Sequence, residues 1–138
     1  DHQQNPNQTV STLNAGDFRE ITLKRNRFGH YVFDGEINHQ KVTFLVDTGA
    51  TTTAIPGRLQ EGLNLSRGIS YSVSTANGSA TAYRTRLPQM SIGDIELTSV
   101  NASIIPAMDT NQVLLGMNVL KHLELVQRGD ELIIRQYR

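Results

Sequence analysis

Residues 44–51 read Phe-Leu-Val-Asp-Thr-Gly-Ala-Thr, and this stretch says most about the fold of the chain. An apolar run typical of a β-strand ends abruptly at Asp47, and Thr48 and Gly49 follow. Strand interiors are poor in Asp, because an ionised carboxylate there loses its hydration without gaining a partner. Gly49 allows close backbone approach, and the hydroxyls of Thr48 and Thr51 can stabilise a partly buried carboxylate. The pattern indicates a carboxylate placed for chemistry, although a strand-to-loop turn capped by Asp has the same local signature.

Short apolar runs separated by turn signals lie on both sides of this stretch. Residues 30–37 and 42–46 flank a four-residue turn at 38–41, which is a hairpin pattern. Residues 69–75 are predicted to pair with 79–87, and 123–126 with 132–134. Between these hairpins, a short run at 90–92 leads through Gly93-Asp94 into a longer run at 95–105. Helical periodicity is scarce, and the best short helix covers residues 116–123. Many short strands with frequent turns predict an all-β barrel or sandwich.

Two other segments are candidates for a site around Asp47. The turn between 69–75 and 79–87 is small and polar, as in a mobile lid over a cleft, but an ordinary surface hairpin also fits it. Its tip consists of Thr75, Ala76, Asn77, Gly78 and Ser79. The second segment, Val113 to Gly116, is an apolar strand that ends in glycine before the predicted helix, a pattern more typical of core than of a site.

Taken together, these segments resemble the retropepsin-like (retroviral-type) aspartic protease family, and within it the bacterial, membrane-anchored branch. The resemblance covers roughly residues 28–137. The run Leu45-Val46-Asp47-Thr48-Gly49-Ala50 matches the family's motif of two apolar residues, Asp, Thr or Ser, Gly, and Ala or Ser. The run Leu114-Leu115-Gly116 matches the second family motif, two apolar residues and Gly before a helix.

The resemblance implies a closed β-barrel-like acid protease fold with a flap hairpin and one short C-terminal helix. It assigns the catalytic role to Asp47, the active-site loop to Thr48, Gly49 and Ala50, the flap to residues 75–79, and a support loop to Leu114, Leu115 and Gly116. It also implies an aspartic endopeptidase that acts on extended protein or peptide segments.

A single Asp-Thr-Gly in the chain has a consequence for assembly. Aspartic proteolysis uses two carboxylates that share one proton around a water molecule. The other aspartates from residue 17 onward lack the apolar lead and the Thr-Gly that follows: Asp17, Asp34, Asp94, Asp109 and Asp130. The resemblance therefore implies a C2 homodimer in which Asp47 of each subunit meets its copy, with Thr48 joining the two loops.

Composition narrows the remaining functions. Thirteen Lys and Arg balance thirteen Asp and Glu, so the chain lacks the basic excess of a nucleic-acid-binding protein. There is no Cys, which excludes thiolate metal sites and Cys nucleophiles. The four His residues match no zinc spacing, so no metal and no cofactor is expected.

The length of 138 residues suits one domain, and we expect it over residues 17–138. Residues 1–16 are rich in Gln, Asn, Ser and Thr and are predicted to form a flexible tail or linker. We expect the domain on the periplasmic side of a bacterial inner membrane, held only through an upstream anchor. Two alternatives stay open: a catalytically silent dimer of the same fold that binds peptides, and the protease of a retroelement polyprotein.

Overall fold

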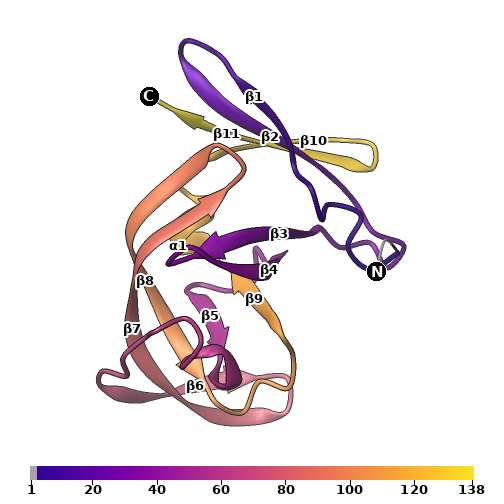
Figure 1. The fold of residues 1–138 in the computed structure, drawn as a ribbon. Coiled ribbons are helices and arrows are strands. Elements are labelled where there is room, and N and C mark those ends of the chain that lie inside the picture. The colour runs from indigo at the N-terminus through magenta and orange to yellow at the C-terminus, as the bar shows by residue number, and fades with distance from the viewer. Residues whose placement is uncertain (1–2) are drawn as a thin grey trace.

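The computed structural model describes residues 3–138 (Figure 1). These residues form β-strands with one α-helical turn and one 3-10 turn. The elements are β1 (Ser11–Asn14), β2 (Phe18–Lys24), β3 (Val32–Ile37), β4 (Gln40–Val46), β5 (Thr53–Pro56), η1 (Gly57–Leu59), β6 (Ser70–Thr75), β7 (Gly78–Ile92), β8 (Ile95–Ile105), β9 (Gln112–Leu115), α1 (Met117–Leu120), β10 (Glu124–Arg128) and β11 (Glu131–Tyr137).

The larger of two sheets closes on itself. Its strands follow the order β3-β4-β9-β5-β8-β7-β6, and an additional pairing between β3 and β7 closes the first six into a barrel. β6 is left outside the ring as the second arm of a hairpin with β7. This confirms the predicted all-β, closed-barrel fold with a projecting hairpin, which lies at the lower end of the molecule in Figure 1.

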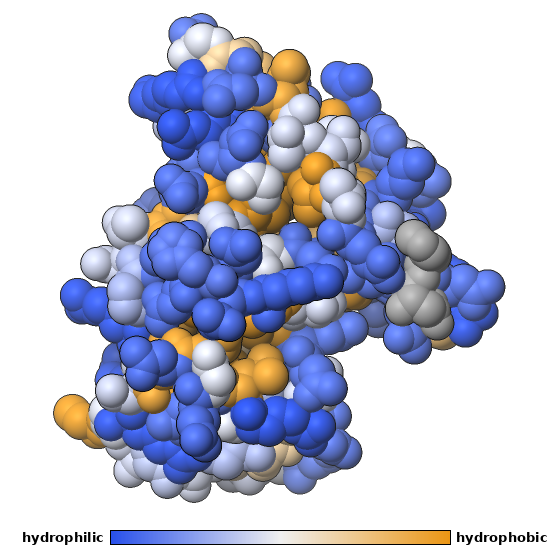
Figure 2. Space-filling view, viewed as in Figure 1, coloured by the Kyte–Doolittle hydropathy of each residue, from blue (hydrophilic) through white to orange (hydrophobic). Residues whose placement is uncertain are grey.

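The second sheet contains the first and the last strand of the chain and lies at the top of Figure 1. Its order is β1-β2-β11-β10, with every neighbouring pair antiparallel. One row of its side chains, Ile21, Leu23, Leu132 and Ile134, joins the same core cluster as the barrel. The two sheets are therefore parts of one hydrophobic core. On the face seen in Figure 2, hydrophilic side chains predominate and apolar residues form small separate groups.

The N-terminal segment differs from the predicted tail. Residues 1–2 lie outside the described part, but β1 pairs with β2, and Asn5 and Asn7 are buried. The side-chain amide of Asn7 donates to the carbonyl oxygens of Lys24 and Val32 at 2.8 and 2.9 Å, and its oxygen accepts from the Lys24 amide at 2.8 Å. A polar side chain can be buried when its amide is satisfied in this way, so the segment is attached at Asn5 and Asn7 and along β1, which the tail prediction did not include.

Two local predictions are also corrected. The β3–β4 hairpin turns on two residues, Asn38 and His39, instead of the four-residue turn at 38–41. Both have positive φ, 52° and 65°, as the tight hairpin turn that suits twisted strands requires. The helix, Met117–Leu120, is shorter than the predicted 116–123, because beyond Lys121 the amides of His122 and Leu123 bond only three residues back before β10 begins. Within residues 3–138, no helix is long and apolar enough to cross a membrane.

Candidate active site

Asp47 stands just beyond the end of β4, where parallel pairing with β9 holds the chain. Val46 is the last paired residue, opposite Leu115, and the Asp47 amide still donates to the Leu115 carbonyl at 3.0 Å. The chain then turns, and the Ala50 amide donates to the Asp47 carbonyl at 3.2 Å. The backbone on both sides of Asp47 is fixed by these hydrogen bonds, while the side chain is half-buried.

The Asp47 carboxylate is held by its own loop. Its Oδ1 accepts a hydrogen bond of 2.9 Å from the Gly49 amide. A Cβ added at Gly49 would lie 3.2 Å from that oxygen, so glycine gives the carboxylate room beside the backbone. Thr48 and Gly49 are exposed and Ala50 is half-buried. The predicted active-site loop therefore presents one carboxylate and one hydroxyl at the surface of the chain.

The predicted support segment lies directly against this loop. A Cβ at Gly116 would be 2.7 Å from the Thr52 carbonyl carbon and 2.9 Å from the Ala50 oxygen, a space that only glycine fits. The next two amides, of Met117 and Asn118, donate to the carbonyls of Ala50 and Thr51 at 2.8 and 3.0 Å. Of the other two predicted residues, Leu115 is fully buried and Leu114 is half-buried. The start of α1 thus fixes the loop that carries Asp47.

Sequence reasoning missed the polar pair that joins these segments. Both the amide and the hydroxyl of Thr53 donate to Oδ1 of Asn118, at 2.9 and 3.0 Å, and the Thr53 oxygen accepts from the Gly116 amide at 3.2 Å. Nδ2 of Asn118 donates to the Asn101 carbonyl on β8 at 2.7 Å. Thr53 is fully buried. The available signal was a threonine opening the apolar run Thr53–Pro56 and an asparagine just after Gly116.

Strand register shows which side chains share a face with Asp47. Neighbouring partners in the barrel are Leu45 with Leu114, Leu114 with Ala54, Ala54 with Ser103, and Ser103 with Arg84. Paired residues project from the same face of a sheet, and so do residues two apart on one strand. Asp47 therefore shares this face, which we call the Asp47 face. The alternate residues Phe44, Val113, Ile55 and Ile104 are fully buried and form the barrel core.

The predicted flap is the β6–β7 hairpin. Thr75 and Gly78 pair at its end, so the loop contains Ala76 and Asn77 alone. The Thr75 hydroxyl donates to the Gly78 carbonyl at 2.7 Å and accepts from the Asn77 amide at 3.2 Å. All five predicted tip residues are exposed. Within residues 3–138, no group of three or more His, Cys, Asp or Glu side chains could hold a metal ion.

Comparison with known proteins places these features in a family. A family described as gag-polyprotein putative aspartyl protease matches residues 33–122, which include Asp47, the flap and Gly116. The chain is 33% identical over 131 residues to an uncharacterized protein in the cobV 5′ region of Sinorhizobium sp.. That alignment covers 92% of this chain and 56% of the relative, so the chain spans a little over half of the relative's length.

Two solved structures share the fold. A retropepsin-like aspartic protease from Rickettsia conorii has a TM-score of 0.73 and 25% identity, over 91% of this chain and 97% of that one. The EIAV protease in complex with the inhibitor HBY-793 has a TM-score of 0.56 and 18% identity, over 70% of this chain and 89% of that one. The second likeness bears on the fold alone.

Proposed function

This chain belongs to the retropepsin-like aspartic protease family, and from that premise we propose that it is an aspartic endopeptidase that works as a homodimer. One observation carries the proposal: Asp47 follows a barrel strand in a loop whose backbone is fixed by β9 and α1, with its carboxylate held by the Gly49 amide. A rigid, partly buried carboxylate at the surface of a subunit is half of the site that such catalysis needs.

The second half would come from a second copy of the chain. Two carboxylates a few ångströms apart share a proton, because like charges at that distance resist double ionisation. The ionised Asp47 would accept a proton from a water molecule as that water attacks the peptide carbonyl carbon. The protonated Asp47 of the other subunit would donate its proton to the carbonyl oxygen. The exposure of Thr48 and Gly49 supports this arrangement, since both are free to meet their copies across a twofold axis.

The substrate would be an extended peptide lying across the Asp47 face beneath the flap. The arms of the β6–β7 hairpin alternate regularly and end in a small, exposed tip, which suits a lid that covers a bound strand. An extended peptide gains affinity from main-chain hydrogen bonds and selectivity from alternate side chains. The periplasmic location and the upstream membrane anchor stay predictions.

Replacing Asp47 tests the proposal. Asp47→Asn keeps the size of the side chain but removes the shared proton, so cleavage of an unfolded protein should fall at least roughly a thousandfold. Asp130→Asn, at an exposed turn, is the matched control and should cleave like the wild type. Mass spectrometry of the digests gives the rates. Substantial cleavage by Asp47→Asn would show that Asp47 is not the catalytic residue. A wild type that binds peptides without cleaving them would favour the alternative, a catalytically silent dimer that binds peptides.

A further inference from the structure

The Asp47 face extends from the candidate active site to the base of the flap. The row of partners that begins at Leu45 ends at Arg84 on β7, two residues after Ala82. Ala82 pairs with Tyr71 on β6, so Tyr71 and Arg84 share this face as well. An extended peptide lying over Asp47 along this face would therefore run toward Arg84.

Arg84 is arranged to meet a partner outside the chain. Its guanidinium lies 5.2 Å from the centre of the Tyr71 ring, and the Tyr71 hydroxyl is hydrogen-bonded to the Ser103 hydroxyl. Ser103 is buried and Arg84 is exposed. Stacking on an anchored aromatic ring limits the freedom of the arginine but leaves its N–H groups available to an acceptor. None of the ion pairs within residues 3–138 involves Arg84.

The surroundings of Arg84 leave its charge uncompensated. Residues 62–93, which contain both arms of the flap, have no Asp or Glu and three arginines, although the whole chain is neutral. Between Leu114 and Arg84, the row on the Asp47 face consists of the small residues Ala54 and Ser103. Both are buried, Ser103 is hydrogen-bonded to Tyr71, and neither carries a charge. The unpaired arginine at the end of that row therefore favours a carboxylate.

We propose that Arg84 selects substrates that carry an acidic side chain on one or both sides of the scissile bond. The inference rests on the proposed peptidase function. The row from β4 to β7 crosses four strand spacings of about 4.8 Å, and an extended chain advances about 3.3 Å per residue. Since the arginine side chain reaches back toward the substrate, the acidic residue would lie about four to six residues from the cleaved bond. A twofold axis would place a second Arg84 on the opposite side.

The first test is cleavage-site profiling with peptides from a trypsin-digested, denatured proteome. The wild type should enrich Asp and Glu about four to six residues from the cleaved bond. Two fluorogenic peptides that differ only by Glu or Gln at the enriched position then give kcat/KM. Arg84→Gln should lower kcat/KM about tenfold for the Glu peptide and leave the Gln peptide unchanged. Arg84→Lys should restore part of the preference, and Arg84→Glu should reverse it toward a Lys peptide.

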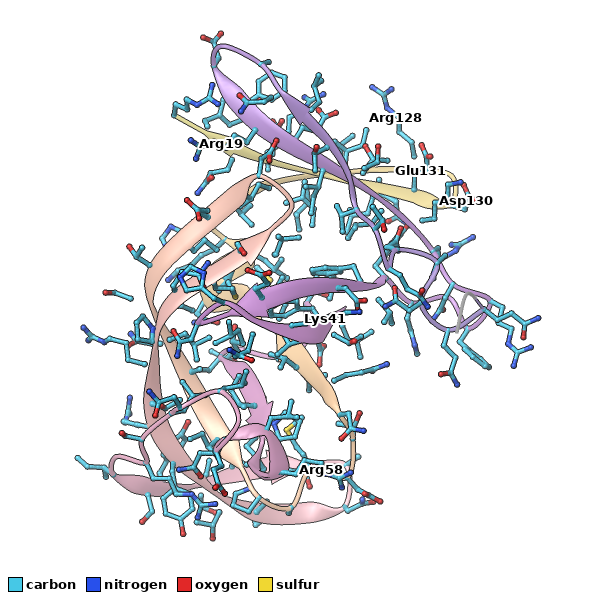
Figure 3. The ribbon with its side chains drawn as sticks, in the orientation of Figure 1. Arg19, Lys41, Arg58, Arg128, Asp130 and Glu131 are labelled. Atoms are coloured by element: carbon cyan, nitrogen blue, oxygen red, sulfur yellow. The ribbon has the colours of Figure 1, made fainter. Side chains whose placement is uncertain are left out.

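The matched control is Arg128→Gln. Arg128 is an exposed arginine on β10, and Figure 3 shows it in the upper sheet, at the end of the molecule away from the β6–β7 hairpin. This variant should retain the Glu preference of the wild type. Because charge recognition at an exposed site is screened, the preference should also weaken as salt is raised. Urea unfolding of Arg84→Gln and Arg128→Gln checks that both variants are equally folded.

A binding experiment distinguishes this inference from the peptidase proposal. The Asp47→Asn protein is titrated against a dye-labelled decapeptide with two Glu near each end, and against its Gln analogue. Preference for the Glu peptide that disappears in Asp47→Asn/Arg84→Gln supports the role of Arg84, even if the wild type cleaves nothing. Cleavage without acidic enrichment, or a preference that survives Arg84→Gln, would overturn the inference and leave the peptidase proposal standing.

Discussion

Asn118 shows how a single side chain can hold the candidate active-site loop. Its Oδ1 satisfies two donors of the buried Thr53, and its Nδ2 reaches the main chain of β8. The Thr53 hydroxyl in turn accepts the Gly116 amide, at the point where β9 leads into α1. Three segments that are distant in sequence therefore meet at one amide, directly beneath the loop that begins at Asp47. The position of the carboxylate depends on a residue that does not touch it.

Removing that amide should destabilise the protein. Asn118→Ala leaves the Thr53 amide and hydroxyl without their acceptor, and each unsatisfied buried group costs about 1–3 kcal/mol. We expect urea unfolding to show a loss of about 2–4 kcal/mol. Asn101→Ala is the matched control, because Asn101 contributes only its main-chain carbonyl and is exposed. An equal loss in both variants would show that the Thr53–Asn118 pair contributes nothing specific.

At the scale of elements, the N-terminal segment joins the two sheets. Asn7 bonds to Lys24 at the end of β2 and to Val32 at the start of β3, and the Asp34 amide donates to the Asn7 carbonyl at 3.1 Å. Asn5 adds a hydrogen bond of 2.9 Å to the Asp34 carboxylate, which also accepts from Thr43 on β4. The segment therefore braces the β3–β4 hairpin, whose second strand leads to Asp47.

A variant of Asn7 tests this brace. Asn7→Ala removes three hydrogen bonds between a buried side chain and the main chain, and it should lower the free energy of unfolding by about 2–4 kcal/mol. Gln8→Ala, at the exposed neighbouring position, should change stability by less than about 0.5 kcal/mol. The urea midpoints of both variants give the comparison. If Asn7→Ala unfolds at the same midpoint as Gln8→Ala, residues 3–14 do not brace the barrel.

The elements that were predictable from sequence are those with local signals. Alternating apolar residues and turn residues predicted the β3–β4, β6–β7 and β10–β11 hairpins, and the abrupt Asp47 predicted the end of a strand at the candidate site loop. The brace at Asn7 and the pair of Thr53 with Asn118 were missed because their partners are distant: Thr53 and Asn118 are separated by 65 positions. An Asn-rich segment looks disordered until the carbonyls that it binds are in place.

For the whole molecule, the central question is whether one subunit can act alone. One chain places one Asp47 on its surface, with the Thr48 hydroxyl exposed beside it. If Thr48 bonds across the axis, Thr48→Val keeps the shape of the side chain but leaves its partner groups unsatisfied twice per dimer. Each such group costs about 1–3 kcal/mol when buried, so dimer association should weaken by at least about tenfold.

The dependence of specific activity on protein concentration measures dimer association directly. Specific activity of the wild type should fall once sedimentation shows monomers, and Thr48→Val should lose activity at a higher concentration. Thr98→Val, which changes an exposed threonine on β8, should lose specific activity at the same concentration as the wild type. Two copies joined by a flexible linker should recover activity in the Thr48→Val background, because the linker raises the effective concentration of the second subunit. Wild-type specific activity that stays constant where sedimentation finds only monomer would contradict the dimer, and it would require a second catalytic carboxylate within one chain.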